Sequence, residues 1–138
     1  MPFRSSFLFL AAIGLVACSN EPAPIEPAPI EIAPQDFVLL PCGPGRADRP
    51  CALAVAGGKR IVFGAPAGAS LSMTDNDLKQ IDAVIVFSLR AADLEGLDEL
   101  RNASWRAGRS TPLLVIGPTG IQDVIEATNK AFEQSDAL

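Results

Sequence analysis

Apolar residues occur in short, separate runs from residue 35 onward, and their spacing predicts alternating strands and helices. The runs with strand character are short and bounded by Gly, Pro or Asp. They lie at 37–40, in the two halves of 51–64, at 82–87 and at 112–116. The Gly57-Gly58 dipeptide divides 51–64 and favours a two-residue hairpin turn. The runs 82–87 and 112–116 are continuously apolar, which predicts strands buried on both faces.

Three further segments have helical spacing or helix-start signals. Residues 74–81 suit a short helix with Thr74 or Asp75 as the N-cap. Leucines then recur at helical spacing at positions 94, 97 and 100. The last segment, 117–134, has Thr119 and Gln122 at the spacing of a capping box. One face of this last helix is expected to carry Ile121, Val124, Ile125, Ala131 and Phe132. Strands followed by alternating helices and strands predict an α/β fold with helices covering at least one sheet face.

The first residues have the pattern of a secretory signal. Arg4 precedes an apolar run at 7–17, which is shorter than the roughly 20 residues needed to span a bilayer. The run ends in Leu-Val-Ala-Cys, which resembles a bacterial lipobox and implies cleavage before Cys18 and lipidation of its thiol. Ser19 then suggests anchoring in the outer membrane, facing the periplasm. An ordinary signal peptide, with Cys18 in place by chance, is the alternative.

A proline-rich segment follows the lipidation site. Residues 21–34 repeat the sequence EPAPI, and this spacing of prolines favours an extended, polyproline-like chain. At ~3.1 Å per residue the segment would reach roughly 45 Å. We interpret it as a stalk between membrane and domain, with a ligand for a proline-binding partner as the alternative. The predicted organisation is a signal peptide at 1–17, a lipidated cysteine and tether at 18–34, and one domain at 35–138.

Composition and charge exclude several functions. Apolar residues make up 49% of the 138 residues, which is enough for the core of one domain. The net charge of −5 is opposite to the basic face that nucleic acids require, so no nucleic-acid partner is expected. The chain has no histidine, which removes the most frequent zinc ligand and general base. In an oxidising compartment, Cys42 and Cys51 are candidates for a disulfide, because they flank a turn-rich segment.

The segment 86–97 has the order strand, loop, helix, which often presents ligands at the carboxyl end of a buried strand. The polar side chains in and beside it are Ser88, Arg90, Asp93, Glu95 and Asp98. Carboxylates without histidine or free cysteine make a poor zinc site. One interpretation is a weak site for a hard cation. The other is that Arg90 pairs with Asp93 and the carboxylates form a solvated helix N-terminus, where negative charge is favoured.

Several short stretches occur in a particular order and spacing along 37–133. They are Ala56-Gly57-Gly58-Lys59, Phe63, the IDAV strand at 81–84, Gly96-Leu97, Trp105 with Gly108-Arg109 and Pro112-Leu113, and Gly117-Pro118 with Gly120. This order resembles the N-terminal half of metallo-β-lactamase-fold hydrolases, in their ribonuclease Z and arylsulfatase-like branch. The resemblance implies half of an αββα sandwich, with a mixed sheet and flanking helices.

The resemblance also places the family's metal motif, H-x-H-x-D-H, on this chain. The motif falls on Ser88, Arg90, Ala92 and Asp93, so its three histidines are replaced and its aspartate is alanine. The earlier family aspartate falls at Gly64. The remaining ligands belong to the C-terminal half of that fold, which these residues are not expected to contain. A pair of zinc ions that activates water needs these groups. The resemblance therefore implies a lost active site that holds no metal and needs no cofactor.

Three functions remain open at this point. The first is a membrane-tethered, non-catalytic binding or assembly module built on a degenerate hydrolase half-fold. Half of a sandwich would expose an apolar sheet face, so self-association or a protein partner is expected. The second is a divergent metal-dependent hydrolase that uses Asp75, Asp77, Asp93 and Glu95. The third is a general envelope lipoprotein whose likeness to the hydrolases is accidental.

Overall fold

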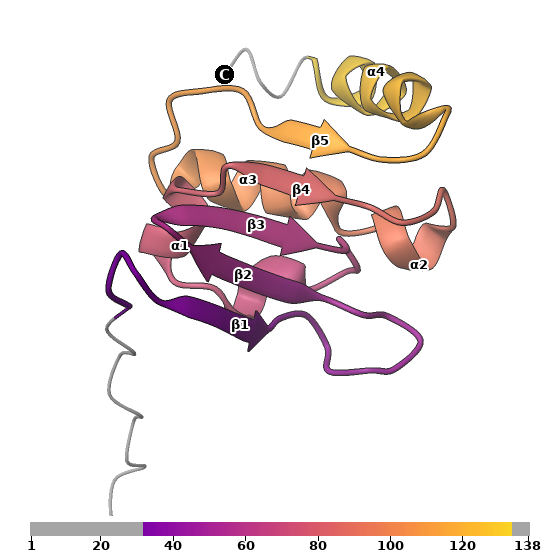
Figure 1. Ribbon diagram of the computed structural model, residues 1–138. Helices are drawn as coiled ribbons and strands as arrows, with labels where there is room; N and C mark the ends of the chain where they lie inside the picture. The colour runs from indigo at the N-terminus through magenta and orange to yellow at the C-terminus, as the bar shows by residue number, and fades with distance from the viewer. Residues whose placement is uncertain (1–31, 134–138) are drawn as a thin grey trace, which may run out of the picture. The chain divides into compact units, whose positions relative to one another are not determined.

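Five strands form one sheet in the order β1-β2-β3-β4-β5 (Figure 1). The computed structural model describes residues 32–133, so the predicted signal peptide, Cys18 and most of the tether lie outside the described residues. The strands are β1 (Phe37–Pro41), β2 (Ala52–Ala56), β3 (Lys59–Phe63), β4 (Ala83–Ile85) and β5 (Leu114–Ile116). The first three strands pair antiparallel, and β3, β4 and β5 pair parallel. The sheet is therefore mixed, as predicted.

One 3₁₀ turn and four α-helices connect and follow the strands. They are η1 (Ala69–Ser72), α1 (Asp75–Lys79), α2 (Ala91–Leu94), α3 (Leu97–Arg106) and α4 (Ile121–Phe132). Figure 1 shows α1 and α3 behind the sheet and α4 beyond β5, while no helix lies in front of the sheet. Within the described residues, none of the helices is both long and apolar enough to cross a membrane.

Local sequence signals explain two of these elements. Gly57 and Gly58 have φ angles of 55° and 76°, which a two-residue turn between β2 and β3 requires and glycine adopts readily. Thr74 is the N-cap of α1. Its hydroxyl accepts a hydrogen bond from the backbone N–H of Asp77, and the Asp77 side chain caps the Thr74 N–H in return. The hairpin is confirmed, and of the two candidate N-caps the structure selects Thr74.

The hydrophobic core lies between the sheet and the helices behind it. Alternate residues of the central strands point toward α1 and α3 and are almost completely buried. The main contributors are Leu53, Val55, Val62, Val84, Leu78, Ile81, Leu97 and Leu100. Burying each such side chain contributes about 1.5–3 kcal/mol. One sheet face thus contributes most of the core, and no helix of the described residues packs on the other face.

The prediction that 112–116 forms a strand buried on both faces is wrong. Strand β5 covers only Leu114–Ile116, and Leu114 and Ile116 are 56% and 47% exposed. The physical reason is that β5 is an edge strand and helices cover only one face of the sheet. In β4, Val84 is fully buried against the helices and Ile85, on the opposite face, is partly exposed. The two apolar runs therefore predicted strands β4 and β5 correctly, but they did not predict that one face of each strand is partly exposed.

The start of α4 also differs from the expectation. Its N-cap is Gly120, with a φ of 95°, and no side chain caps the helix, so the capping box of Thr119 and Gln122 is wrong. Ile121, Val124 and Ile125 are partly buried, as the spacing predicts, whereas Ala131 and Phe132 are exposed. The helix has no fully buried residue. Its packed face is therefore shorter than predicted.

Candidate functional site

The resemblance places the hydrolase metal motif on Ser88 and Arg90, in the loop after β4, and on Ala92 and Asp93, in α2. Asp93 is only 4% exposed and accepts a hydrogen bond from the Ser88 hydroxyl. The Arg90 guanidinium lies 3.7 Å from the same carboxylate and is itself largely exposed. The predicted pairing of Arg90 with Asp93 is therefore confirmed, whereas the predicted solvated carboxylate is wrong for Asp93, because the fold buries it. Ala92 offers no ligand atom. The one carboxylate of this loop is engaged in holding the loop together.

The other acidic residues considered for a metal site are held elsewhere. Glu95 forms an ion pair with Arg49. Asp77 pairs with Arg60 at 3.1 Å and also belongs to the capping box of α1. Across residues 32–133, no three Cys, Asp or Glu side chains form a group that could hold a metal ion. The structure does not bring the four carboxylates of the alternative hydrolase site together.

Gly64, where the resemblance places an earlier metal ligand, has no room for a side chain. Its φ angle is +80°, and a Cβ at this position would lie 2.2 Å from the carbonyl oxygen of Pro50. Its N–H donates a hydrogen bond of 2.8 Å to the carbonyl of Ile85, at the end of β4. Backbone from the 43–50 loop thus fills the position from which an aspartate would reach a metal.

A disulfide joins Cys42 and Cys51, with their Cα atoms 4.9 Å apart. This is the pairing that the sequence suggests. It connects the residue after β1 to the residue before β2, so it closes the 43–50 loop at its base. Cys42 is buried in the core cluster. The disulfide therefore holds the edge strand β1 to the rest of the sheet.

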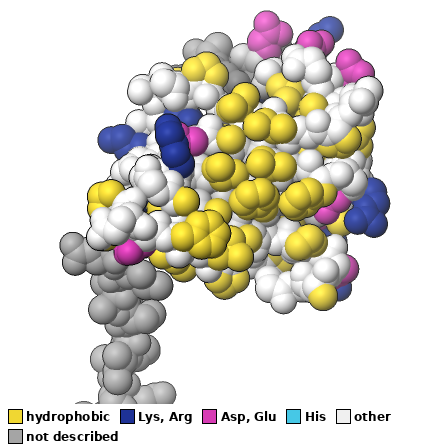
Figure 2. Space-filling view, in the orientation of Figure 1, with side chains coloured by type: hydrophobic (Ala, Val, Ile, Leu, Met, Phe, Trp, Pro, Cys, Tyr) yellow, Lys and Arg dark blue, Asp and Glu magenta, His cyan; other side chains and the backbone are white. Residues whose placement is uncertain are grey.

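The sheet face opposite the helices is apolar and lacks a covering layer within the described residues. Residues that pair across neighbouring strands share a face. We call this surface the open sheet face. It consists of Phe37, Leu39, Pro41, Ala52, Ala54, Ala56, Lys59, Ile61, Phe63, Ala83, Ile85, Phe87, Leu114 and Ile116. Figure 2 shows apolar side chains across the middle of this face.

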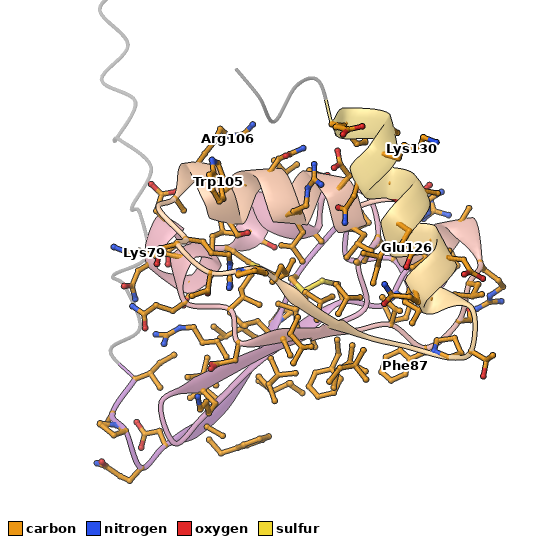
Figure 3. The ribbon with its side chains drawn as sticks, turned by 90° about the horizontal axis from the view of Figure 1, so that it is seen from above. Lys79, Phe87, Trp105, Arg106, Glu126 and Lys130 are labelled. Atoms are coloured by element: carbon orange, nitrogen blue, oxygen red, sulfur yellow. A yellow bond between two sulfur atoms is a disulfide. The ribbon has the colours of Figure 1, made fainter. Side chains whose placement is uncertain are left out.

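The largest side chains of the open sheet face are exposed to a degree unusual for their type. Phe37 is 73% exposed and Leu39 is 59% exposed. Phe87 is 61% exposed and stacks on Phe63, with ring centroids 6.2 Å apart. Figure 3 shows Phe87 on the side of the sheet away from α3. Contiguous apolar surface of this kind marks interaction sites in soluble domains.

The open sheet face carries one charged residue, Lys59, at its end. The Lys59 ammonium lies 2.8 Å from Asp82 and forms an ion pair with it. Burial raises the pKa of Asp82, but the hydrogen bonds from Lys59 and from the backbone N–H of Arg60 outweigh this and lower the pKa below its usual value. The face therefore has no unpaired charge.

A cavity of about 520 Å³ lies behind the sheet, between α3, the 109–115 segment and α4. Leu97, Trp105, Val115 and Ile125 supply apolar walls. Arg109 also lines it, is buried, and donates a hydrogen bond to the carbonyl of Ile81. Burial lowers the pKa of this guanidinium, and the Asp82 carboxylate partly offsets the effect. Sequence reasoning missed this cavity because its walls come from segments that only tertiary packing brings together.

Comparison with known proteins gives one sequence relative and a shared fold. No family model matches the chain. Residues of this chain are 28% identical over 97 positions to a protein named ribonuclease Z from Clostridium beijerinckii, covering 66% of this chain and 32% of that protein. The crystal structure of the short form of human tRNase Z superposes with a TM-score of 0.55 and 19% identity, covering 70% of this chain and 39% of that one. The chain thus spans about a third of the length of the curated relative that it matches.

These matches define the fold class. Residues 32–133 form a mixed α/β sheet with flanking helices, which corresponds to part of a metallo-β-lactamase-like fold. The predicted fold class is confirmed.

Proposed function

We propose that this chain is a membrane-anchored envelope lipoprotein whose domain is a non-catalytic binding or assembly module. The observation that carries the proposal is the open sheet face. Phe37, Leu39, Phe87, Leu114 and Ile116 are each between 47% and 73% exposed on one surface. Leaving such a surface in water is unfavourable by about 25 cal/mol per Å² of apolar area. A partner that covers it would recover this free energy, so the face suits binding.

The state of the metal loop supports a non-catalytic role. Water activation by a metal needs ligands that converge on an ion and an open coordination position. In the 88–93 loop the side chains converge on each other, because Ser88 and Arg90 both contact Asp93. The fixed positive charge of Arg90 would also repel a cation at this position.

The sequence supports the membrane anchor. Cys18 follows an apolar run and the residues of a lipobox, and the proline-rich 21–34 segment would hold the domain away from the bilayer. Several acyl chains on one cysteine make a stable anchor, whereas a single chain binds only marginally. We expect the full chain to incorporate labelled palmitate and to fractionate with the outer membrane, and Cys18→Ser to lose both properties.

The similarity to ribonuclease Z favours a second candidate function, a divergent metal-dependent hydrolase. This candidate needs a metal site that the 32–133 region does not form from Cys, Asp or Glu side chains. Its test is hydrolysis of a phosphodiester such as bis(p-nitrophenyl) phosphate, with zinc or manganese added to the full chain. Turnover that a chelator abolishes and that Asp93→Asn weakens would replace the binding proposal by the hydrolase.

The binding proposal is tested by photo-cross-linking of the full chain in intact cells. The photoreactive residue p-benzoylphenylalanine replaces Leu39, which lies on the open sheet face. In a matched control it replaces Arg106, which is exposed on α3 at the opposite side of the sheet (Figure 3). A discrete cross-linked band from position 39, and none from position 106, is the expected result. The absence of any band from position 39 would overturn the proposal.

A further inference from the structure

We propose that the occupant of the open sheet face is a second copy of this chain, so that two sheets pack face to face about a two-fold axis. The inference rests on the proposed function and names the partner that the function leaves open. Homodimers with two-fold symmetry are the most frequent oligomers, and each copy then presents the same surface to the other. Three properties of the open sheet face fit such a self-contact.

The first property is its area. Five side chains on the face are each about half exposed or more: Phe37, Leu39, Phe87, Leu114 and Ile116. At roughly 200 Å² for a large apolar side chain, their exposed parts amount to roughly 600 Å². Stable interfaces bury about 800 Å² on each partner. The partly exposed Ile61, Phe63 and Ile85 lie between the five and supply further area. The face is therefore large enough for a stable dimer.

The second property is its charge. A two-fold contact sets identical surfaces against each other, so any unpaired charge near the axis would meet its own copy and repel it. The chain as a whole has a net charge of −5, yet the open sheet face contains only Lys59. This ammonium is already paired with Asp82 at 2.8 Å. The open sheet face can thus oppose a copy of itself without repulsion.

Charge also favours a protein over a lipid surface as the occupant. Faces that bind anionic bilayers combine apolar side chains with a rim of Lys and Arg. Here the single basic residue at the face is neutralised by Asp82. The open sheet face would offer a bilayer apolar contact, and its one basic residue, already paired with Asp82, would add little electrostatic attraction.

The third property is the relief of the face. On β2, Ala52, Ala54 and Ala56 form a row of small side chains. The register sets larger neighbours on both sides of this row: Ala54 pairs with Leu39 on β1 and with Ile61 on β3. With the two-fold axis along β3 all five strands overlap, and Ile85 on β4 of one copy can lie over the alanine row of the other. The two-fold axis repeats this contact, so the small side chains of each copy receive larger side chains of the other. Side chains that interdigitate in this way fill the roughly 10 Å between packed sheets.

Cysteine cross-linking of the full chain in cells tests the proposal. Two copies with different tags are co-expressed, one carrying Leu39→Cys and the other Leu114→Cys, which face each other across an axis along β3, and a short bifunctional maleimide is added. A matched pair carries Arg106→Cys in both copies, and the unsubstituted chain controls for Cys18. We expect a product that contains both tags from the open-face pair and only background from the Arg106→Cys pair.

A second variant separates loss of contact from loss of folding. Ile61→Lys on β3 sets two ammonium groups near each other across the axis, so we expect cross-linking of Leu39→Cys with Leu114→Cys to fall at least about tenfold. Retention of the Cys42–Cys51 disulfide and of protease resistance would show that the domain still folds. Equal yields from the open-face and Arg106→Cys pairs would overturn the proposal. A discrete band from position 39 that contains a different protein would also overturn it, while leaving the binding function intact. No band from position 39 would overturn both.

Discussion

The Ser88 hydroxyl donates a hydrogen bond to the Asp93 carboxylate, which the fold buries to 4% exposure. Asp93 is the residue on which the sequence resemblance places the end of the hydrolase metal motif, and here it organises the turn into α2. A buried polar network of this kind contributes to stability, and removing one member leaves the others without a partner. The 88–93 segment is therefore a structural element of the domain.

Substitution of Asp93 is expected to destabilise the domain. Asp93→Ala leaves the partly buried Ser88 hydroxyl without its acceptor and should lower the free energy of unfolding by about 1–3 kcal/mol. The matched control is Glu126→Ala on α4, an exposed carboxylate that should change stability by less than about 0.5 kcal/mol. Urea denaturation followed by circular dichroism measures both. Equal effects from the two substitutions would contradict a structural role for Asp93.

A side chain at Gly64 is expected to disrupt its packing against the 43–50 loop. Gly58→Ala measures the effect of a positive φ alone, because a Cβ there meets nothing within 4 Å. We expect it to lower the free energy of unfolding by about 1–2 kcal/mol. Gly64 has a similar φ, but a Cβ there would also lie 2.2 Å from the Pro50 carbonyl oxygen. Gly64→Ala should therefore lower the free energy of unfolding by about 1–3 kcal/mol more than Gly58→Ala does. The difference between the two variants in urea denaturation is the measured quantity. A difference near zero would mean that the 43–50 loop moves aside freely.

Loss of the disulfide is expected to loosen β1. The cysteines are 9 residues apart, and the entropy of closing such a loop in the unfolded chain corresponds to about 2.5 kcal/mol. The double variant Cys42→Ser with Cys51→Ser should lose at least this much, because Cys42 is also buried. Reduction of the unsubstituted domain with dithiothreitol should give a similar loss. Hydrogen exchange should then be faster in β1 than in β4. Equal protection of the two strands would contradict the idea that the disulfide holds β1 to the sheet.

Stability should fall at acid pH through Asp82. The hydrogen bonds from Lys59 and Arg60 lower its pKa below the ordinary value of 3.8, so the folded state favours the ionised carboxylate. This contribution is complete above pH 3.8 and is lost as the pH falls from there through the lowered folded-state pKa. Thermal unfolding of the domain and of Asp82→Asn at neutral and acid pH measures the effect. The unsubstituted domain should lose more stability than the variant, and parallel curves would exclude Asp82 as the cause.

Local patterns predicted the elements that depend on few neighbours. The hairpin follows from Gly57-Gly58, and the N-terminus of α1 follows from Thr74 with Asp77. The pairing of Arg90 with Asp93 follows from a three-residue spacing on one turn. That Ala92 and Gly64 cannot ligate a metal also follows from residue type alone, since neither has a side-chain atom that could do so. In each case the interacting groups are close in sequence or the chemistry belongs to one residue.

The sequence by itself determined the class of fold and the absence of histidine chemistry. Only the tertiary structure decided that Leu114 and Ile116 are exposed and that Gly120 rather than Thr119 begins α4. It also decided that one whole sheet face lacks a covering layer within residues 32–133. The physical reason is that periodicity reports which side chains are apolar, whereas exposure depends on which distant segments pack over them. A continuous apolar run is compatible with a strand buried in its own domain and with a strand whose second face is left for a partner.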